Sequence, residues 1–344
     1  MLKTRRITWH CSSPAARGRG AAVVGNATLL LSRDRLTAQD LATLREVCAR
    51  MAFEIAYLPG DESMPLFAAL AEGRPPALQD DPNRFRLDAP TDNNPFFFNM
   101  MHLRTLLDPE VWQRQSGSPN LRALSNLLLL LAIVTGLTVV CFLPPLLASR
   151  DRHRLGRRDL PFLLFFAAIG LGFMLVEVAQ MQRLIIFLGH PTYSLSVVLF
   201  SLLVAGGLGS WLSEKIGRDD LARGGAWALA TIVLVVGLAG VLTPKLAHAF
   251  QDAETPVRIA IAAASIATIG LFMGMAFPLG LRAAAGQSPG LTPWLWGLNG
   301  AASVCASVLA VAISLEGGIT ATSWVGTGCY LAALLAFRLA TRSA

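Results

Sequence analysis

A single carboxylate within a long apolar run is the residue whose chemistry needs explaining first. Glu177 lies inside PFLLFFAAIGLGFMLVEVAQMQRLIIFL, residues 161–188. An ionisable side chain in the middle of a bilayer costs roughly 2.5–3.5 kcal/mol on insertion scales, so it needs a partner or a function. Gln180 follows three residues later and therefore shares a helix face with Glu177, and Arg183 follows one turn further.

This polar group has two interpretations, and the sequence leaves both open. In the functional one, Glu177, Gln180 and Arg183, with His190 from the GHPT break that follows, form a membrane polar site for a cation or proton, or a seat for a soluble domain. In the structural one, Glu177 is protonated or paired with Arg183 or another helix and holds the bundle together. One Glu and a distant His are too few ligands for a metal, so we expect no metal and no cofactor.

A second polar stripe lies in a later apolar segment. Asn299, Ser303 and Ser307 recur every four residues after Trp294 and Trp296. We include Asn299 and Ser303 in the candidate polar site, although such stripes more commonly pack helices through hydrogen bonds of roughly 0.6–2 kcal/mol each. The sequence contains no Ser/His/Asp arrangement, no paired catalytic carboxylates and no Walker-type loop, so it predicts no catalytic residue.

The elements that position these side chains are expected to be membrane-spanning helices. The 344-residue chain is 53% hydrophobic and 15% charged, with a mean hydropathy of +0.52, which is not typical of a soluble protein. About 20 apolar residues at 1.5 Å rise cross a hydrocarbon core. The segments that meet this criterion are 124–148, 160–188, 192–212, 225–246, 257–280, 293–315 and 320–340.

The distribution of positive charge predicts how these helices are oriented. Loop 149–159 carries five arginines, and the positive-inside rule therefore places it and the C-terminus in the cytoplasm. With seven spans, residues 1–120 lie outside; an adenosyl-dependent domain would be expected inside. Either the span count is wrong by one or the N-terminal module faces outward.

Residues 1–120 are predicted to form a separate, nearly neutral module, and residues 121–344 the transmembrane domain. The N-terminal module is predicted to contain a strand over 21–31, a helix from the capping box Thr37–Asp40 to about residue 51, and a strand over 53–58. A proline-rich linker over 61–120 follows. Two or three strands cannot bury a core alone, so the module resembles the end of a larger α/β domain of Rossmann-like type.

Charge and cysteine content exclude two classes of protein. The net charge of +7 and the pI near 9.6 come from arginines in loops between apolar segments, with no basic stripe interleaved with aromatics. This pattern argues against a nucleic-acid partner and for a lipid bilayer. The five cysteines are scattered and form no Cys/His cluster, so they predict neither a disulfide framework nor a zinc site.

Three stretches together resemble a known family. GFMLVEVAQMQRLIIFLGHPTYSLSVVLFSLLVAGGLGS (172–210) resembles a signature of bacterial membrane-embedded spermidine synthase-like proteins, in which a polyamine aminopropyltransferase-type domain is joined to multi-pass helices. PTDNNPFFFN (90–99) is similar to the PTDDRPFFF segment of that family, and WLWGLNGAASVCASVLAV (294–311) to its Trp-Asn-Gly-Ala-Ala-Ser helix. Asn93 and Asn94 stand where the family has Asp and Arg, so an ion pair is missing there.

The resemblance implies a multi-pass protein of the bacterial inner membrane. The Gly-rich adenosyl-binding strand and the catalytic Asp of the family have no match in this sequence. The first hypothesis is therefore a membrane module without its own catalysis that anchors or serves a transferase domain, or a partner transferase chain. The alternative is a transporter or binding protein for a small cation such as a polyamine, with Glu177 as its acidic site.

Overall fold

The computed structural model describes residues 7–12, 26–32, 34–59, 89–115, 118–148, 159–217 and 220–342. The chain divides into two compact units, residues 1–87 with 104–122, and residues 88–103 with 123–344. Residues 88–103 thus belong with the helices, although a single boundary near residue 120 was expected. The start of the first predicted strand (21–25), most of the proline-rich linker (60–88) and most of the arginine-rich loop (149–158) lie outside the described residues.

The first unit contains a small sheet beside helix α1 (Ala38–Arg50). Its strands are β1 (Ile7–Ser12), β2 (Asn26–Leu31) and β3 (Glu54–Tyr57), in the order β2-β1-β3 with every pairing antiparallel. The helix begins as predicted, because Thr37 and Asp40 form the reciprocal capping box. The central strand β1 was not predicted, and the described strands show none of the parallel pairing on which a Rossmann-like sheet depends. The short helices η2 (Leu103–Leu107) and α3 (Pro109–Gln115) follow.

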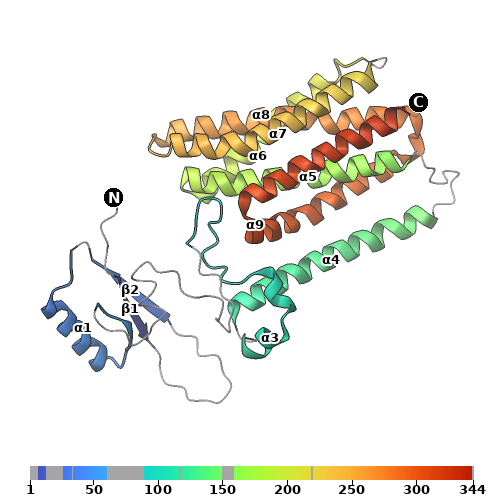
Figure 1. Ribbon diagram of the computed structural model, residues 1–344. Coiled ribbons are helices and arrows are strands. Elements are labelled where there is room, and N and C mark those ends of the chain that lie inside the picture. Colours follow the sequence, from blue (N-terminus) through green and yellow to red (C-terminus); the bar gives the residue numbers. More distant parts are fainter. Residues whose placement is uncertain are drawn as a thin grey trace. The chain divides into compact units, whose positions relative to one another are not determined.

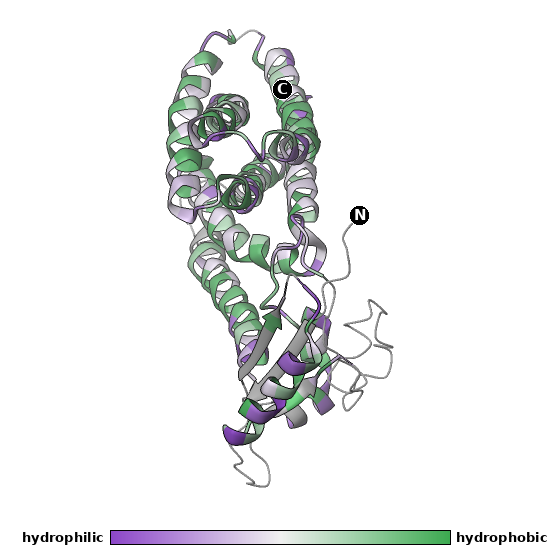
Figure 2. Ribbon diagram, turned by 90° about the vertical axis from the view of Figure 1, so that its left-hand side faces the viewer, coloured by the Kyte–Doolittle hydropathy of each residue, from purple (hydrophilic) through white to green (hydrophobic). Residues whose placement is uncertain are grey.

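The second unit is a bundle of long apolar helices (Figure 1). Six helices of the described chain are long and apolar enough to cross a membrane, which indicates a multi-pass membrane protein. Apolar residues dominate these helices in Figure 2, and hydrophilic residues gather at their ends. The helices are α4 (Pro119–Ala148), α5 (Leu160–Leu188), α6 (Pro191–Ser213), α7 (Leu221–Ala249), α8 (Thr255–Gln287) and α9 (Thr292–Arg342).

The count of helices is six rather than the expected seven because the last two predicted spans form one element, α9. This element is not straight. Gly318 has φ 83° and ψ 168°, and Thr322 Oγ1 donates a hydrogen bond to Ala310 O at 3.4 Å. Twelve residues of straight helix would separate those positions by about 18 Å. The chain therefore reverses at Gly318, and the two halves of α9 run back along each other (Figure 1).

Helix α5 lies at the centre of this unit and contacts α6, α7, α8 and α9. Its fully buried Phe165 packs against Phe166 of the same helix and Phe337 of α9, with ring centroids 5.2 and 5.7 Å apart. Helix α4 is mostly exposed within the chain and reaches α9 through Phe142, whose ring lies 5.5 Å from that of Trp294. Most of the apolar surface of α4 is thus exposed within this chain.

Helices α6 and α8 approach each other closely through glycines. A Cβ added to Gly274 would collide with the backbone of Gly206, and one added to Gly209 would collide with that of Leu271. Small residues let apolar helices make such contacts in a membrane, where lipid competes equally well for larger side chains. The glycine-rich stretches in both sequences are therefore explained by helix packing.

Candidate functional site

Glu177 and Gln180 lie side by side on the buried face of α5. Glu177 is 8% exposed and Gln180 is 1% exposed. Both amide atoms of Gln180 lack a hydrogen-bond partner among the described residues. An unsatisfied buried amide costs about 1–3 kcal/mol, and in an apolar helix bundle the cost is not relieved by water. The pair is therefore a polar spot with unused hydrogen-bonding capacity near the middle of the bundle.

Arg183, one turn further along α5, has partners on two other helices. Its side chain is 7% exposed, and it donates to Gly240 O of α7 at 3.2 Å and to Thr320 Oγ1 of α9 at 3.1 Å. The carbonyl of Gly240 is free because Pro244, four residues later, has no N–H to donate to it. Arg183 thus replaces the missing helical hydrogen bond of α7 and ties three helices together.

The network continues from α9 to residues 89–103, which we call the strap. Thr320 donates to Asn93 Oδ1 through its backbone N–H at 2.8 Å and through its hydroxyl at 2.6 Å. Ile319 N donates to Asn93 O at 2.9 Å. Because the Thr320 hydroxyl also accepts from Arg183, one chain of hydrogen bonds runs from α5 through α9 to the strap. The left-handed Gly318 lies beneath Asn93, and a Cβ there would come within 2.6 Å of Asn93 Nδ2.

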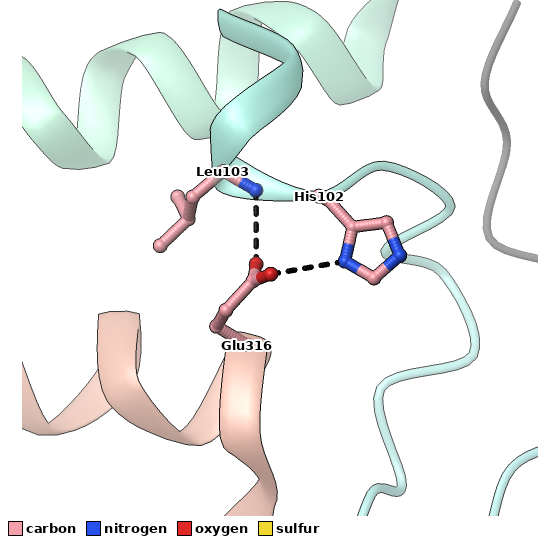
Figure 3. A network of polar contacts seen from close by, with 3 residues as sticks. All are labelled: His102, Leu103 and Glu316. Atoms are coloured by element: carbon pink, nitrogen blue, oxygen red, sulfur yellow. Dashed lines mark hydrogen bonds and ion pairs between the residues drawn. The ribbon is translucent and has the colours of Figure 1, made fainter.

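A carboxylate on the other side of the reversal holds the end of the strap (Figure 3). Glu316 Oε2 accepts a hydrogen bond from Leu103 N at 3.0 Å, and Oε1 lies 3.0 Å from His102 Nδ1. The side chains of His102 and Glu316 are 25% and 40% exposed, so solvent weakens the ion pair that forms when His102 is protonated. The reversal at Gly318 is therefore fastened to the strap on both sides.

The other predicted site residues lie away from Glu177. His190 is the N-cap of α6, where its Nδ1 accepts from Thr192 N at 3.3 Å, and it is exposed. Asn299 donates to Phe166 O of α5 at 3.1 Å, and Ser303 donates to Gly170 O at 3.2 Å. Asn299 and Ser303 thus join the first half of α9 to a part of α5 about two turns or more before Glu177. These contacts are those of a helix-packing stripe.

A cavity lies where α5 and α7 end and α8 begins. This cavity has a volume of about 320 Å³, and its lining includes Arg183, Arg258 of α8, His248 of α7 and Asn93 and Asp92 of the strap. Arg258 donates to Phe187 O at 3.0 Å. The cavity is therefore built on the same hydrogen-bonded junction that holds the strap.

The sequence interpretation did not select Arg258, Thr320 or Glu316 for the site. Two signals in the sequence point toward this junction. Pro244 inside an apolar segment frees a carbonyl that some donor must satisfy, and Gly317-Gly318 beside Glu316 interrupts an apolar run. Neither signal identifies the residue that forms the hydrogen bond, because that residue depends on how the helices pack.

The polar side chains that lie together in the second unit limit the chemistry that this unit can support. Among the described residues no three His, Cys, Asp or Glu side chains lie close enough together to hold a metal ion. Glu177 with Gln180 offers a hydrogen-bonding spot within the bundle, and the junction at Gly318 offers arginines and a cavity. Comparison of the chain with models of protein families, with curated proteins and with solved structures found no match.

Proposed function

We propose that this chain is the integral membrane module of a spermidine synthase-like protein of the bacterial inner membrane. It has no catalysis of its own, and it anchors or serves a polyamine-type transferase domain carried on the same or on a partner chain. The resemblance of residues 90–99, 172–210 and 294–311 to that family is the reason for naming this kind of transferase. The six long apolar helices supply the membrane anchor.

The observation that carries the proposal is the attachment of the strap to α9. Three hydrogen bonds to Asn93 and two contacts of Glu316 hold residues that lead directly from the polar N-terminal part of the chain. Each such bond contributes about 0.5–1.5 kcal/mol net. A connector held at several points supports the proposal that the bundle seats a domain that precedes the strap in the sequence.

Fractionation of the native cells tests the anchoring function. Aminopropyl transfer to labelled putrescine is measured in membrane and soluble fractions, with and without deletion of this chain. The proposal predicts that membrane-bound activity disappears on deletion, because its anchor is gone. Unchanged membrane-bound activity after deletion would show that the chain does not anchor the transferase.

The second candidate function, a binding protein or transporter for a small cation, is favoured by one observation. Glu177 and Gln180 are buried together, and Gln180 has no partner within the described residues. A carboxylate and an amide oxygen are acceptors that an ammonium group of a polyamine can use. Ligand binding would remove the cost of leaving these groups unpaired.

Substitution of Glu177 by Gln separates the two functions. The variant keeps the size of the side chain and removes its charge, so uptake or binding of labelled spermidine should be lost if the cation site exists. Glu214→Gln is a matched control, because Glu214 is an exposed carboxylate at the end of α6. Normal spermidine uptake by both variants would eliminate the transporter and leave the anchoring function unaffected.

A further inference from the structure

The cavity at the junction of α5, α7, α8 and the strap has an unusual charge composition. Two arginines line it, Arg183 and Arg258, together with the exposed His248 and Gln251. Asp92 of the strap is the one carboxylate among its lining residues, and it forms no ion pair with either arginine within the described chain. The cavity is therefore positively charged overall.

Within the described part of the chain, every hydrogen-bond acceptor that the two guanidinium groups use is neutral. Arg183 donates to a carbonyl and a hydroxyl, as described above. Arg258 donates to Phe187 O at 3.0 Å and to Thr255 Oγ1 at 3.3 Å, and its buried Nε has no partner among the residues that the structure describes. Arg183 is buried, and a buried cation without an opposite charge is costly, whereas Arg258 is half-buried. A guanidinium has five N–H donors, so both groups retain donors for an anion.

The position and size of the cavity narrow the chemistry of that anion. The cavity lies where α5 and α7 end and α8 begins, which is the depth of lipid headgroups for helices of this length. A water molecule takes up about 30 Å³ of liquid, so roughly 320 Å³ accommodates a phosphate with a substituent. Arginine pairs well with phosphate because its planar fork can donate two parallel hydrogen bonds.

We propose that this cavity is a binding site for a phosphate-type anion, held between Arg183 and Arg258. The group that binds is a phosphate, which either the headgroup of an anionic phospholipid or free phosphate can supply. This site is separate from Glu177 and goes beyond the proposed function. It also accounts for the buried Arg183, which forms no ion pair within the described residues.

Binding to the purified full chain in a non-ionic detergent tests the site. The probes are inorganic phosphate, dioctanoyl phosphatidylglycerol, and dioctanoylglycerol, which has the same acyl chains without the phosphate. Retention of the probe by native mass spectrometry and the shift of the thermal unfolding midpoint are recorded. Stabilisation by phosphatidylglycerol alone identifies a lipid headgroup site, and stabilisation by inorganic phosphate as well identifies a site for free phosphate.

Variants then locate the binding. Arg258→Gln should weaken binding of the effective probe at least tenfold. Arg282→Gln should not, although Arg282 likewise donates to carbonyls at the end of a neighbouring helix, Ile216 O and Ser213 O. Arg282 lines a different cavity, where the described lining residues include no second arginine, and it is therefore the matched control.

A further variant covers the case in which Arg258→Gln does not fold. Gln251→Glu changes an exposed lining residue just beyond the end of α7 and adds a negative charge without removing a described hydrogen bond. It should weaken binding at least threefold. Binding by neither phosphate probe, equal binding of dioctanoylglycerol, or unchanged binding in Gln251→Glu would each overturn the proposal.

Discussion

The reversal of α9 at Gly318 gives the sharpest prediction, that Gly318→Ala destabilises the membrane unit. With φ 83° and ψ 168°, Gly318 occupies a region that only glycine adopts freely, and forcing a side chain into it costs about 1–3 kcal/mol. The new Cβ would also lie 2.6 Å from Asn93 Nδ2 and 2.8 Å from Asn93 O. Moving Asn93 away weakens three hydrogen bonds of about 0.5–1.5 kcal/mol each, and because Asn93 is exposed we take the lower end of that range.

The sum is a loss of roughly 2.5–4.5 kcal/mol in the free energy of unfolding. Gly328→Ala is the matched control, because this glycine lies on the same element, is exposed, and would place its Cβ in open space. That substitution should be neutral or stabilise the helix by about 0.5–1 kcal/mol. Both variants are compared with the wild type by thermal unfolding in one detergent, followed by tryptophan fluorescence. A Gly318→Ala variant as stable as the wild type, or a Gly328→Ala variant equally damaged, would refute the reasoning.

Three further predictions concern other parts of the chain. Glu316→Ala should lower the free energy of unfolding by about 1–2 kcal/mol, because it removes the acceptor of Leu103 N and the partner of His102, and it should speed proteolysis within the strap. Gly274→Leu should destabilise the bundle by roughly 1–3 kcal/mol or prevent its assembly, since the side chain has no room against the backbone of α6; unfolding in detergent at wild-type temperature would contradict this. Hydrogen bonds in the capping box hold the pKa of Asp40 below its usual value, so the stabilisation of α1 by Asp40 is present at neutral pH and is lost as the pH falls through the lowered pKa. Hydrogen exchange of the α1 amides should follow this pH dependence, and the Asp40→Asn substitution should abolish the pH dependence.

Much of the helical part of the fold could be predicted because hydropathy determines it directly. The bounds predicted for residues 160–188 coincide with those of α5. The spans predicted before and after it lie inside α4, α6, α7 and α8 and differ from their ends by up to seven residues, and the last two predicted spans both lie within α9. The interruption near residue 318 was located, but it was expected to be a loop between two helices. A single glycine in an extended left-handed conformation is enough to reverse the chain there, and a hydropathy pattern does not distinguish these cases.

Strand β1 and the partners of the polar residues could not be predicted for a different reason. Ile7–Ser12 is a short strand that acquires its role by pairing with β2 and β3 on both sides, so its structure depends on distant residues. The same holds for Arg183, which the sequence selects by its position in an apolar helix. Its acceptor, Gly240 O, is 57 residues away and is available because of Pro244. Contacts of this kind follow from helix packing and not from local pattern.

The measurement that tests the central claim most directly is made on the assembly purified from its native membrane in mild detergent. Aminopropyl transfer to labelled putrescine is assayed on this assembly, and peptide mapping then identifies every polypeptide segment present. We expect transfer activity together with segments outside residues 1–344, either upstream on the same polypeptide or on a partner chain. Activity from an assembly that contains residues 1–344 alone, or an assembly that has no transfer activity, would contradict the account.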